Sequence, residues 1–372
     1  MPKLIFYPVD NADSCFIELD NKQLILIDYA NLGDLENKED LRIDLESEIK
    51  ETLKQKNKDN IDVVAFTHLD RDHIGGASTL FYLEHAPKYQ DNDRLKIDTL
   101  WIPASAILEE GAEYEARIIR AEARYRLKKG KGVRVFSRPQ KLEAWLNQQG
   151  LSLESRKHLI TDAGKTIPEF TTNQHGVEFF VHSPFAKRLN DKEVIDRNSD
   201  CIVIQATFLC GDEKTKVILT GDIPYEGLSE IVSITKYHNN EHRLEWDIYA
   251  VPHHCSYLSL ASDKGTHKTQ PTEEIKWLLE QQGQQRGIIV SSSKIIPNED
   301  TTQPPHRQAA KYYQECADNI DGDFLVTMEH PNKSAPKPLI INIDRFGVTV
   351  EKKSFSGVPS IISNPAPRAG SS

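Results

Sequence analysis

Residues 62–76 read DVVAFTHLDRDHIGG and place a short apolar run directly before a group of metal-binding side chains. The run Val63–Phe66 suits a buried parallel strand. The side chains that follow it are two histidines and two aspartates within six residues, His68, Asp70, Asp72 and His73. Imidazole and carboxylate groups together favour divalent metals of the zinc, manganese or iron kind. A solvated polar loop is the alternative, but this grouping behind an apolar strand predicts a metal site.

The overall composition indicates a globular chain with room for a large core. The 372 residues are 38% hydrophobic, and no apolar run approaches the ~20 residues that cross a bilayer. The N-terminus, MPKLIFYPVD, lacks an export-signal pattern. Five cysteines without a C-x-x-C motif are expected to be free thiols of a reducing cytosol. We therefore expect a cytoplasmic protein without a membrane partner, and the net charge of −10 argues against overall attraction to nucleic acid.

Two more expected strands end at residues that can bind metal. The strand Lys216–Leu219 runs into the sequence TGD, which ends at Asp222. The strand Trp246–Val251 runs into PHHCS, which contains His253 and His254. An ordinary turn is the alternative for TGD. The repeated placement of ligand-type residues at strand ends, together with the alternation of strands and helices, predicts a layered α/β architecture.

The motif HLDRDH followed by IGG fits the pattern H-x-D-x-D-H-I-G-G. By these residues the chain resembles the metallo-β-lactamase superfamily, and within it the ComEC-like branch, which often has aspartate where most members have histidine, as at Asp70. The resemblance extends across most of the chain. It implies a four-layer αβ/βα sandwich over residues 1–355 and a metal-dependent hydrolase with two divalent ions, zinc or manganese.

The resemblance also implies which residues bind the metals. The implied ligands are His68, Asp70, Asp72, His73, Asp222 and His254. Asp222 would bridge the two ions, and Asp72 would also be catalytic. Asp13 and Asp28 match a turn and an L-I-D motif of the family and would orient the ligands by hydrogen bonding. The glycines of that turn are replaced here, so its geometry is expected to differ.

Two further histidines are candidates for catalysis. His253 would contact phosphate or transfer a proton, and the roles of His253 and His254 could be exchanged. His306 follows two prolines and would face the substrate, with a plain surface histidine as the alternative. The family also has a histidine ligand between the first loop and the bridging aspartate. His158, His175 and His182 lie in that interval. His182 stands where relatives usually have an apolar residue, so the alignment does not make it a ligand, although a ligand role for it is kept as the alternative. The position of His68 and Asp70 could therefore bind its metal weakly.

A basic segment interrupts this acidic chain. Residues 104–150 are expected to form a helical insertion, with a long helix over Ala106–Lys129. From 117 to 141 there are ten Lys and Arg residues and one acid. Arg117, Arg120 and Arg124 are spaced to share a helix face and are candidates for substrate binding, with a solvated face as the alternative. From Ser356 the chain is rich in Ser, Pro, Gly and Ala, and 356–372 is expected to be a disordered tail.

The metal motifs alone serve phosphodiester, ester or lactam bonds equally, because metal binding lowers the pKa of water whatever the substrate. The resemblance and the basic segment favour a phosphodiesterase or nuclease acting on nucleic acid. One alternative is a hydrolase of a small phosphorylated or cyclic-nucleotide-type molecule. The other is an effector or scaffold subunit of a bacterial defence system, with a partner protein from a neighbouring gene. The retained ligand residues argue against the scaffold.

Overall fold

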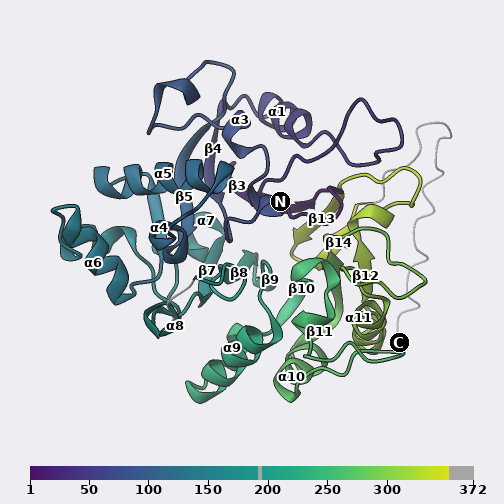
Figure 1. The fold of residues 1–372 in the computed structure, drawn as a ribbon. Coiled ribbons are helices and arrows are strands. Elements are labelled where there is room, and N and C mark those ends of the chain that lie inside the picture. Colours follow the sequence, from purple (N-terminus) through teal and green to yellow (C-terminus); the bar gives the residue numbers. More distant parts are fainter. Residues whose placement is uncertain (192–194, 352–372) are drawn as a thin grey trace, which may run out of the picture.

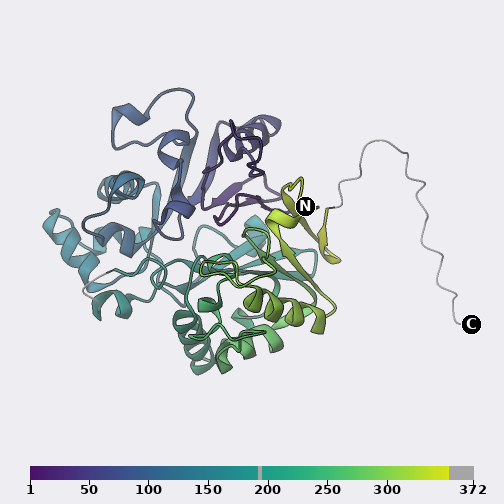
Figure 2. The same cartoon turned by 45° about the vertical axis from the view of Figure 1, so that its right-hand side comes forward.

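The computed structural model describes residues 1–191 and 195–351, so the expected disordered tail lies outside the described residues. Two β-sheets lie face to face, and helices cover the outer face of each sheet (Figures 1 and 2). The order of layers is helix, sheet, sheet, helix. The predicted four-layer α/β sandwich is therefore confirmed.

The first sheet has eight strands among the described residues, in the order β14-β13-β1-β2-β3-β4-β5-β6. They are β1 (Lys3–Phe6), β2 (Cys15–Glu18), β3 (Leu24–Ile27), β4 (Asn60–Ala65), β5 (Lys96–Pro103), β6 (Val133–Phe136), β13 (Leu339–Asp344) and β14 (Gly347–Val350). Pairing is antiparallel from β14 to β3 and parallel from β3 to β6. The carboxyl ends of β3 and β4 therefore meet at one edge of the sheet.

The second sheet has six strands over the same described ranges, in the order β12-β11-β10-β9-β8-β7. They are β7 (Val177–Ser183), β8 (Val203–Cys210), β9 (Glu213–Leu219), β10 (Trp246–Ala250), β11 (Gly283–Ser291) and β12 (Asp323–Val326). Strands β7, β8 and β9 are antiparallel, and β9 to β12 are parallel. The ends of β9 and β10 therefore also share an edge.

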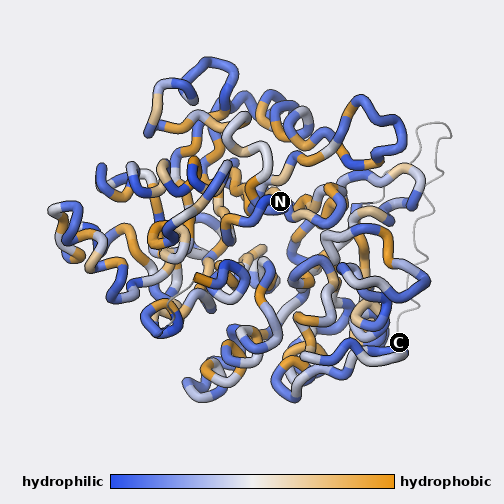
Figure 3. Tube along the Cα trace, in the orientation of Figure 1, coloured by the Kyte–Doolittle hydropathy of each residue, from blue (hydrophilic) through white to orange (hydrophobic). Residues whose placement is uncertain are grey.

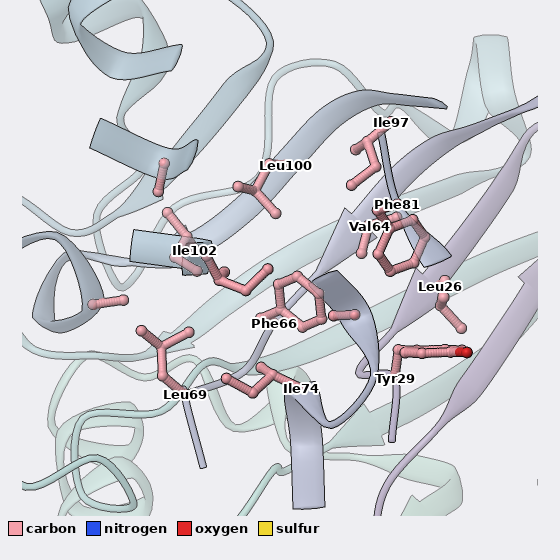
Figure 4. Close-up of a cluster of buried hydrophobic side chains, with 14 of the residues drawn as sticks. Leu26, Tyr29, Val64, Phe66, Leu69, Ile74, Phe81, Ile97, Leu100 and Ile102 are labelled. Carbon is pink, nitrogen blue, oxygen red and sulfur yellow. The ribbon is translucent and has the colours of Figure 1, made fainter. Parts of the chain in front are cut away.

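The alternation of side chains along each strand builds the layers. In β3, Leu24 and Leu26 join the apolar cluster beneath the helices, while Ile25 and Ile27 join the cluster between the sheets. Hydrophobic segments follow the strands, and hydrophilic ones follow the loops and outer helix faces (Figure 3). Figure 4 shows part of the cluster beneath the helices, in which the rings of Phe66 and Phe81 lie 6.4 Å apart.

The outer helices bury their apolar faces on the sheets. Helices α1, α3 and α5 cover the first sheet, and α9, α10 and α11 cover the second. The α-helices are α1 (Leu45–Gln55), α2 (Arg71–Ile74), α3 (Ala77–Leu80), α4 (Ala104–Leu108), α5 (Tyr114–Lys129), α6 (Gln140–Gln148), α7 (Thr172–His175), α8 (Ala186–Asp191), α9 (Tyr225–Tyr237), α10 (Glu273–Gln281) and α11 (Arg307–Asn319). None of the described helices is long and apolar enough to cross a membrane.

The prediction of one long helix over Ala106–Lys129 is wrong, because the structure has two separate helices there, α4 and α5. Helix α4 ends at Leu108, and α5 begins at Tyr114. Gly111 lies between them with φ +74°, a left-handed conformation that glycine adopts without the steric cost of a side chain. The segment between the two helices carries Glu109, which pairs with Arg197 beside the ligand loop.

A cluster of four aromatic side chains packs between the two sheets. Trp101 is 1% exposed, and its ring meets Phe136, Phe170 and Phe179 edge-on at centroid distances of 5.9, 5.7 and 5.4 Å. We expect Trp101→Ala to lower the free energy of unfolding by about 3–5 kcal/mol, because it leaves a cavity in a packed core. Urea denaturation measures the change. The control is Tyr237→Ala, whose ring is 82% exposed and whose loss should cost less than about 0.5 kcal/mol. Equal losses for both variants would contradict the prediction.

Candidate metal centre

The ligand-type residues predicted from the sequence meet where the parallel strands of both sheets end. Asp28 follows β3, and the loop containing His68 and His73 follows β4. Asp222 follows β9, and His254 follows β10 in a short 3₁₀ turn. The carboxyl ends of parallel strands are the usual place for sites in α/β folds. Strand polarity therefore brings together segments that are far apart in the sequence.

A compact cluster of four residues forms the centre of the site. Its members are Asp13, His73, Asp222 and His254, whose ligand atoms all lie within 4.8 Å of one another. His73 Nε2 is 3.2 Å from Asp222 Oδ1 and 3.8 Å from Asp13 Oδ2. Asp13 was expected to orient other ligands, but its carboxylate lies in the cluster itself. The backbone explains this placement, because the Asp13 N–H donates to the carbonyl of Asp72, 3.0 Å away.

Several polar atoms at this centre have no hydrogen-bond partner. His68 Nε2, His73 Nε2 and Asp222 Oδ1 are buried and form no hydrogen bond within the part of the chain that the structure describes, although His73 Nε2 and Asp222 Oδ1 lie within ion-pair distance of each other at 3.2 Å. A buried polar atom without a partner costs about 1–3 kcal/mol. Imidazole nitrogens and carboxylate oxygens facing one another at these distances are the donor set of a divalent metal. The residues present therefore fit a metal ion.

Hydrogen bonds from neighbouring groups orient the side chains of the candidate ligands. His73 Nδ1 is 2.8 Å from Asp28 Oδ2, so its Nε2 points to the centre. The Thr67 N–H and hydroxyl donate to the two Asp28 oxygens at 2.7 and 2.6 Å. His254 Nδ1 lies 2.9 Å from the carbonyl of Ser292. Each ring nitrogen that does not face the centre is thus held, which fixes the orientation of the other.

The remaining predicted ligands surround Asp222. His68 Nε2 is 3.9 Å from Asp222 Oδ2 and 3.6 Å from Asp70 Oδ2. Asp72 Oδ2 is 3.2 Å from His254 Nε2. Asp222 therefore faces three histidines, because its Oδ1 lies near His73 Nε2 while its Oδ2 is 3.9 Å from both His68 Nε2 and His254 Nε2.

The charges of the centre shift the pKa values of its members. Burial lowers the pKa of His254, but the carboxylates of Asp222 and Asp72 outweigh burial and raise that pKa to about 9. Burial and the neighbouring His73 lower the pKa of His68 to about 3. The His68 imidazole is therefore neutral at pH 7 and free to bind a metal.

The two candidate catalytic histidines differ in accessibility. His253 is partly exposed, and its Nδ1 lies 3.4 Å from the amide nitrogen of Asn198. His306 is 2% exposed, its Nδ1 accepts a hydrogen bond from the Tyr257 N–H at 3.3 Å, and its ring packs on the Tyr257 ring at 4.9 Å. His306 is thus not a surface histidine, and its contact with substrate stays a prediction.

The three arginines expected to share a helix face lie on α5. Arg120 donates to the carbonyl of Glu109, and Arg124 Nε donates to the carbonyl of Ile107 at 2.8 Å. Arg117 is exposed, with no side-chain partner among residues 1–191 and 195–351. Two of the three guanidinium groups are therefore used within the protein. Substrate binding by this face stays a prediction.

Sequence reasoning missed one residue at the centre. Arg197 Nη1 donates to Asp70 Oδ1 at 2.7 Å, and its Nη2 donates to Glu109 Oε1 at 2.6 Å. These partners lie 127 and 88 residues away, so no local pattern marks them. Arg197 also lies outside every motif identified in the sequence.

The histidines considered for the missing ligand point elsewhere. His182 Nε2 lies 2.9 Å from the carbonyl of Arg243, His175 Nδ1 accepts from the Thr171 N–H, and His158 is exposed. None of these three side chains belongs to the metal-type cluster found in the described residues.

His182 makes the stability of the protein depend on pH. Burial lowers its pKa from 6.5 to about 4, so between these values the unfolded chain binds the proton and the folded chain does not. The free energy of unfolding therefore falls by up to about 3 kcal/mol as the pH drops through this window. His182→Gln should flatten this slope in urea titrations without changing metal stoichiometry. The exposed His158→Gln is the control, and an unchanged slope in His182→Gln would show that this histidine does not remain neutral.

Comparisons with known proteins found distant structural neighbours, which include two metallo-β-lactamases. No protein-family model matches the chain, and no curated protein matches it. The class B3 di-zinc metallo-β-lactamase LRA-12 from an Alaskan soil metagenome is 11% identical, with 86% of this chain and 91% of that chain covered and a TM-score of 0.30. BJP-1, a subclass B3 metallo-β-lactamase of Bradyrhizobium japonicum, is 14% identical, with 67% and 75% covered and a TM-score of 0.26. Both TM-scores are below 0.5, so the interpretation of the site rests on its own geometry.

Proposed function

We propose that this protein is a metal-dependent hydrolase whose substrates are phosphodiesters. The observation that carries the proposal is the buried cluster of Asp13, His73, Asp222 and His254. Its inward-facing atoms include His73 Nε2 and Asp222 Oδ1, which lie 3.2 Å apart but form no hydrogen bond within the described residues. A cluster with a purely structural role would satisfy these atoms with hydrogen bonds, whereas a metal centre leaves them for the ion.

The chain offers two adjoining metal positions that share Asp222. Asp13, Asp72, His73 and His254 would complete one position, and His68 and Asp70 the other. Bound divalent ions lower the pKa of water towards neutrality and stabilise charge on phosphoryl oxygens. The protein fixes the positions by the contacts of Asp28 and Ser292 with the histidine rings.

His253 is the residue best placed to give a proton to a leaving oxygen. The Asn198 amide donates to His253 Nδ1, so in the neutral ring the proton lies on Nε2. His253, Asn198, Tyr225 and Leu258 line a cavity of about 550 Å³ beside the centre. A histidine with its Nε2–H towards a cavity can act as a general acid.

Two exposed arginines support an anionic substrate. Arg71 lies between the ligands Asp70 and Asp72, and Arg117 lies on α5; neither side chain has an ion-pair partner in the described ranges. Arg71 and the start of α5 border one cavity of about 590 Å³ next to the ligand loop. The lining also includes Glu113, Glu115 and Arg197, so Arg71 at the ligand loop is the side chain that favours a phosphate group. A cavity of this volume would also hold a small nucleotide, which keeps the small-molecule alternative open.

We expect Asp72→Ala and His73→Gln to lower kcat more than about 100-fold, because even residues that only support metal ligands cost 10–100-fold when changed. The assay compares bis(p-nitrophenyl) phosphate, single- and double-stranded DNA, RNA, a cyclic nucleotide and a chromogenic cephalosporin, each with zinc, manganese and magnesium. Asp162→Ala is the control, since this aspartate pairs with Arg138 in a different part of the protein.

The wild type should cleave at least one phosphodiester of this panel, and the control should retain wild-type rates. Metal content and circular dichroism show whether the inactive variants have lost the ion or the fold. Cleavage of the cephalosporin alone would contradict the proposed substrate class. Full activity of Asp72→Ala at saturating metal would place the catalytic centre elsewhere.

Arg117 tests whether the substrate is a polyanion. Arg117→Glu should raise the KM for a nucleic acid several-fold and reduce the slope of affinity against salt by about one, because a phosphate contact releases counterions. Rates with bis(p-nitrophenyl) phosphate should stay unchanged. The matched control is Lys128→Glu, an exposed basic residue near the other end of α5. Equal KM values for Arg117→Glu and wild type on every nucleic acid would favour a small-molecule substrate.

A further inference from the structure

Arg197 brings a positive charge directly onto one of the metal-type ligands. Its Nη1 donates to Asp70 Oδ1 at 2.7 Å and to the carbonyl of Leu69 at 2.9 Å. Its side chain is 27% exposed, so solvent reaches it only in part. Hydrogen bonds between a guanidinium and a carboxylate are stronger than neutral ones, and this pair fixes the orientation of the Asp70 side chain.

The two oxygens of Asp70 have different neighbours. Oδ1 accepts from Arg197, while Oδ2 faces His68 Nε2 at 3.6 Å. Oδ2 is therefore the oxygen that faces an ion at the His68–Asp70 position. The guanidinium also opposes a cation there by charge repulsion.

Glu109 holds Arg197 from the other side. Arg197 Nε and Nη2 donate to Glu109 Oε1 at 3.1 and 2.6 Å. The backbone of Glu109 is itself held by two hydrogen bonds. Its N–H donates to the carbonyl of Ser105, and its carbonyl accepts from the Arg120 side chain. A chain of contacts therefore connects the basic helix α5 to Asp70 through Glu109 and Arg197.

The neighbouring position has no such cation. Asp13, Asp72, His73 and His254 surround it with Asp222, and no arginine or lysine forms an ion pair with any of these five among residues 1–191 and 195–351. We propose that Arg197 is a positioning residue that makes the His68–Asp70 position the weaker of the two, with Glu109 moderating its charge. This inference rests on the proposed function, because it requires that the centre binds metal ions.

Removing the positive charge of Arg197 and removing the negative charge of Glu109 should change the affinity for the second metal ion in opposite directions. Arg197→Gln removes the positive charge but keeps a hydrogen-bond donor, so the second ion should bind about tenfold more tightly. Glu109→Gln removes the counter-charge and leaves the guanidinium uncompensated, so the second ion should bind about tenfold more weakly. Simple loss of structure would weaken binding in both variants alike.

The experiment is a calorimetric titration of the metal-free full-length protein with zinc and with manganese, in the absence of substrate. The first binding step should stay within about twofold of wild type in both variants. Arg243→Gln is the control, since Arg243 pairs with Glu178 and is 20% exposed, similar to Arg197. Its two binding steps should equal those of the wild type. If the wild type takes up only one ion, the inference requires that Arg197→Gln takes up a second.

The inference is overturned if Arg197→Gln leaves the second step unchanged or weakens it, or if both variants shift it in the same direction. Such a result would leave the proposed function intact, because the first ion would still bind. A wild-type protein that binds neither metal would overturn the inference and the proposed function together.

Discussion

The hydrogen bond between Asp28 and His73 is the constraint on which the rest of the centre depends. It joins Asp28 Oδ2 to His73 Nδ1 over 2.8 Å, and both side chains are almost fully buried. Asp28 has φ +57° at the end of β3, and its N–H donates to the carbonyl of Ala65 at the end of β4. The N–H of Tyr29 donates to the carbonyl of His73. The pairing of β3 with β4 therefore sets the position of the ligand loop, and the side-chain bond sets the direction of His73 Nε2.

Much of the site could be predicted because its main parts follow strands of one polarity. The loop after β4 carries its ligands in contiguous sequence, and Asp222 and His254 each follow an apolar run, so strand ends alone predict a common edge. The role of Asp13 was less visible. Its turn lacks the expected glycines, and the bond from its N–H to the carbonyl of Asp72 joins residues far apart in the chain. A contact of that kind leaves no periodic or compositional trace.

The basic segment shows why composition alone could not predict its role. Arg126, in the last turn of α5, is buried and donates to Glu122 and to the carbonyl of Ile97. Arg134, on β6, is 2% exposed and pairs with Glu169. The acids that pair with such residues lie outside the run or four residues away within it, so counting charges in a window overstates the free positive charge. Six of the ten basic residues are exposed, but two of these six, Lys129 and Arg138, pair with Glu84 and Asp162.

The charges at the centre also explain why an aspartate at position 70 comes with Arg197. Burial lowers the pKa of His73, but the carboxylates of Asp222 and Asp28 outweigh burial and raise it well above the usual range. A metal that binds these imidazoles must compete with the protons that the raised pKa values favour. His68 stays neutral and cannot offset Asp70. Arg197 supplies the missing positive charge there, and Glu109 limits it, so the three side chains together keep one negative charge for a cation.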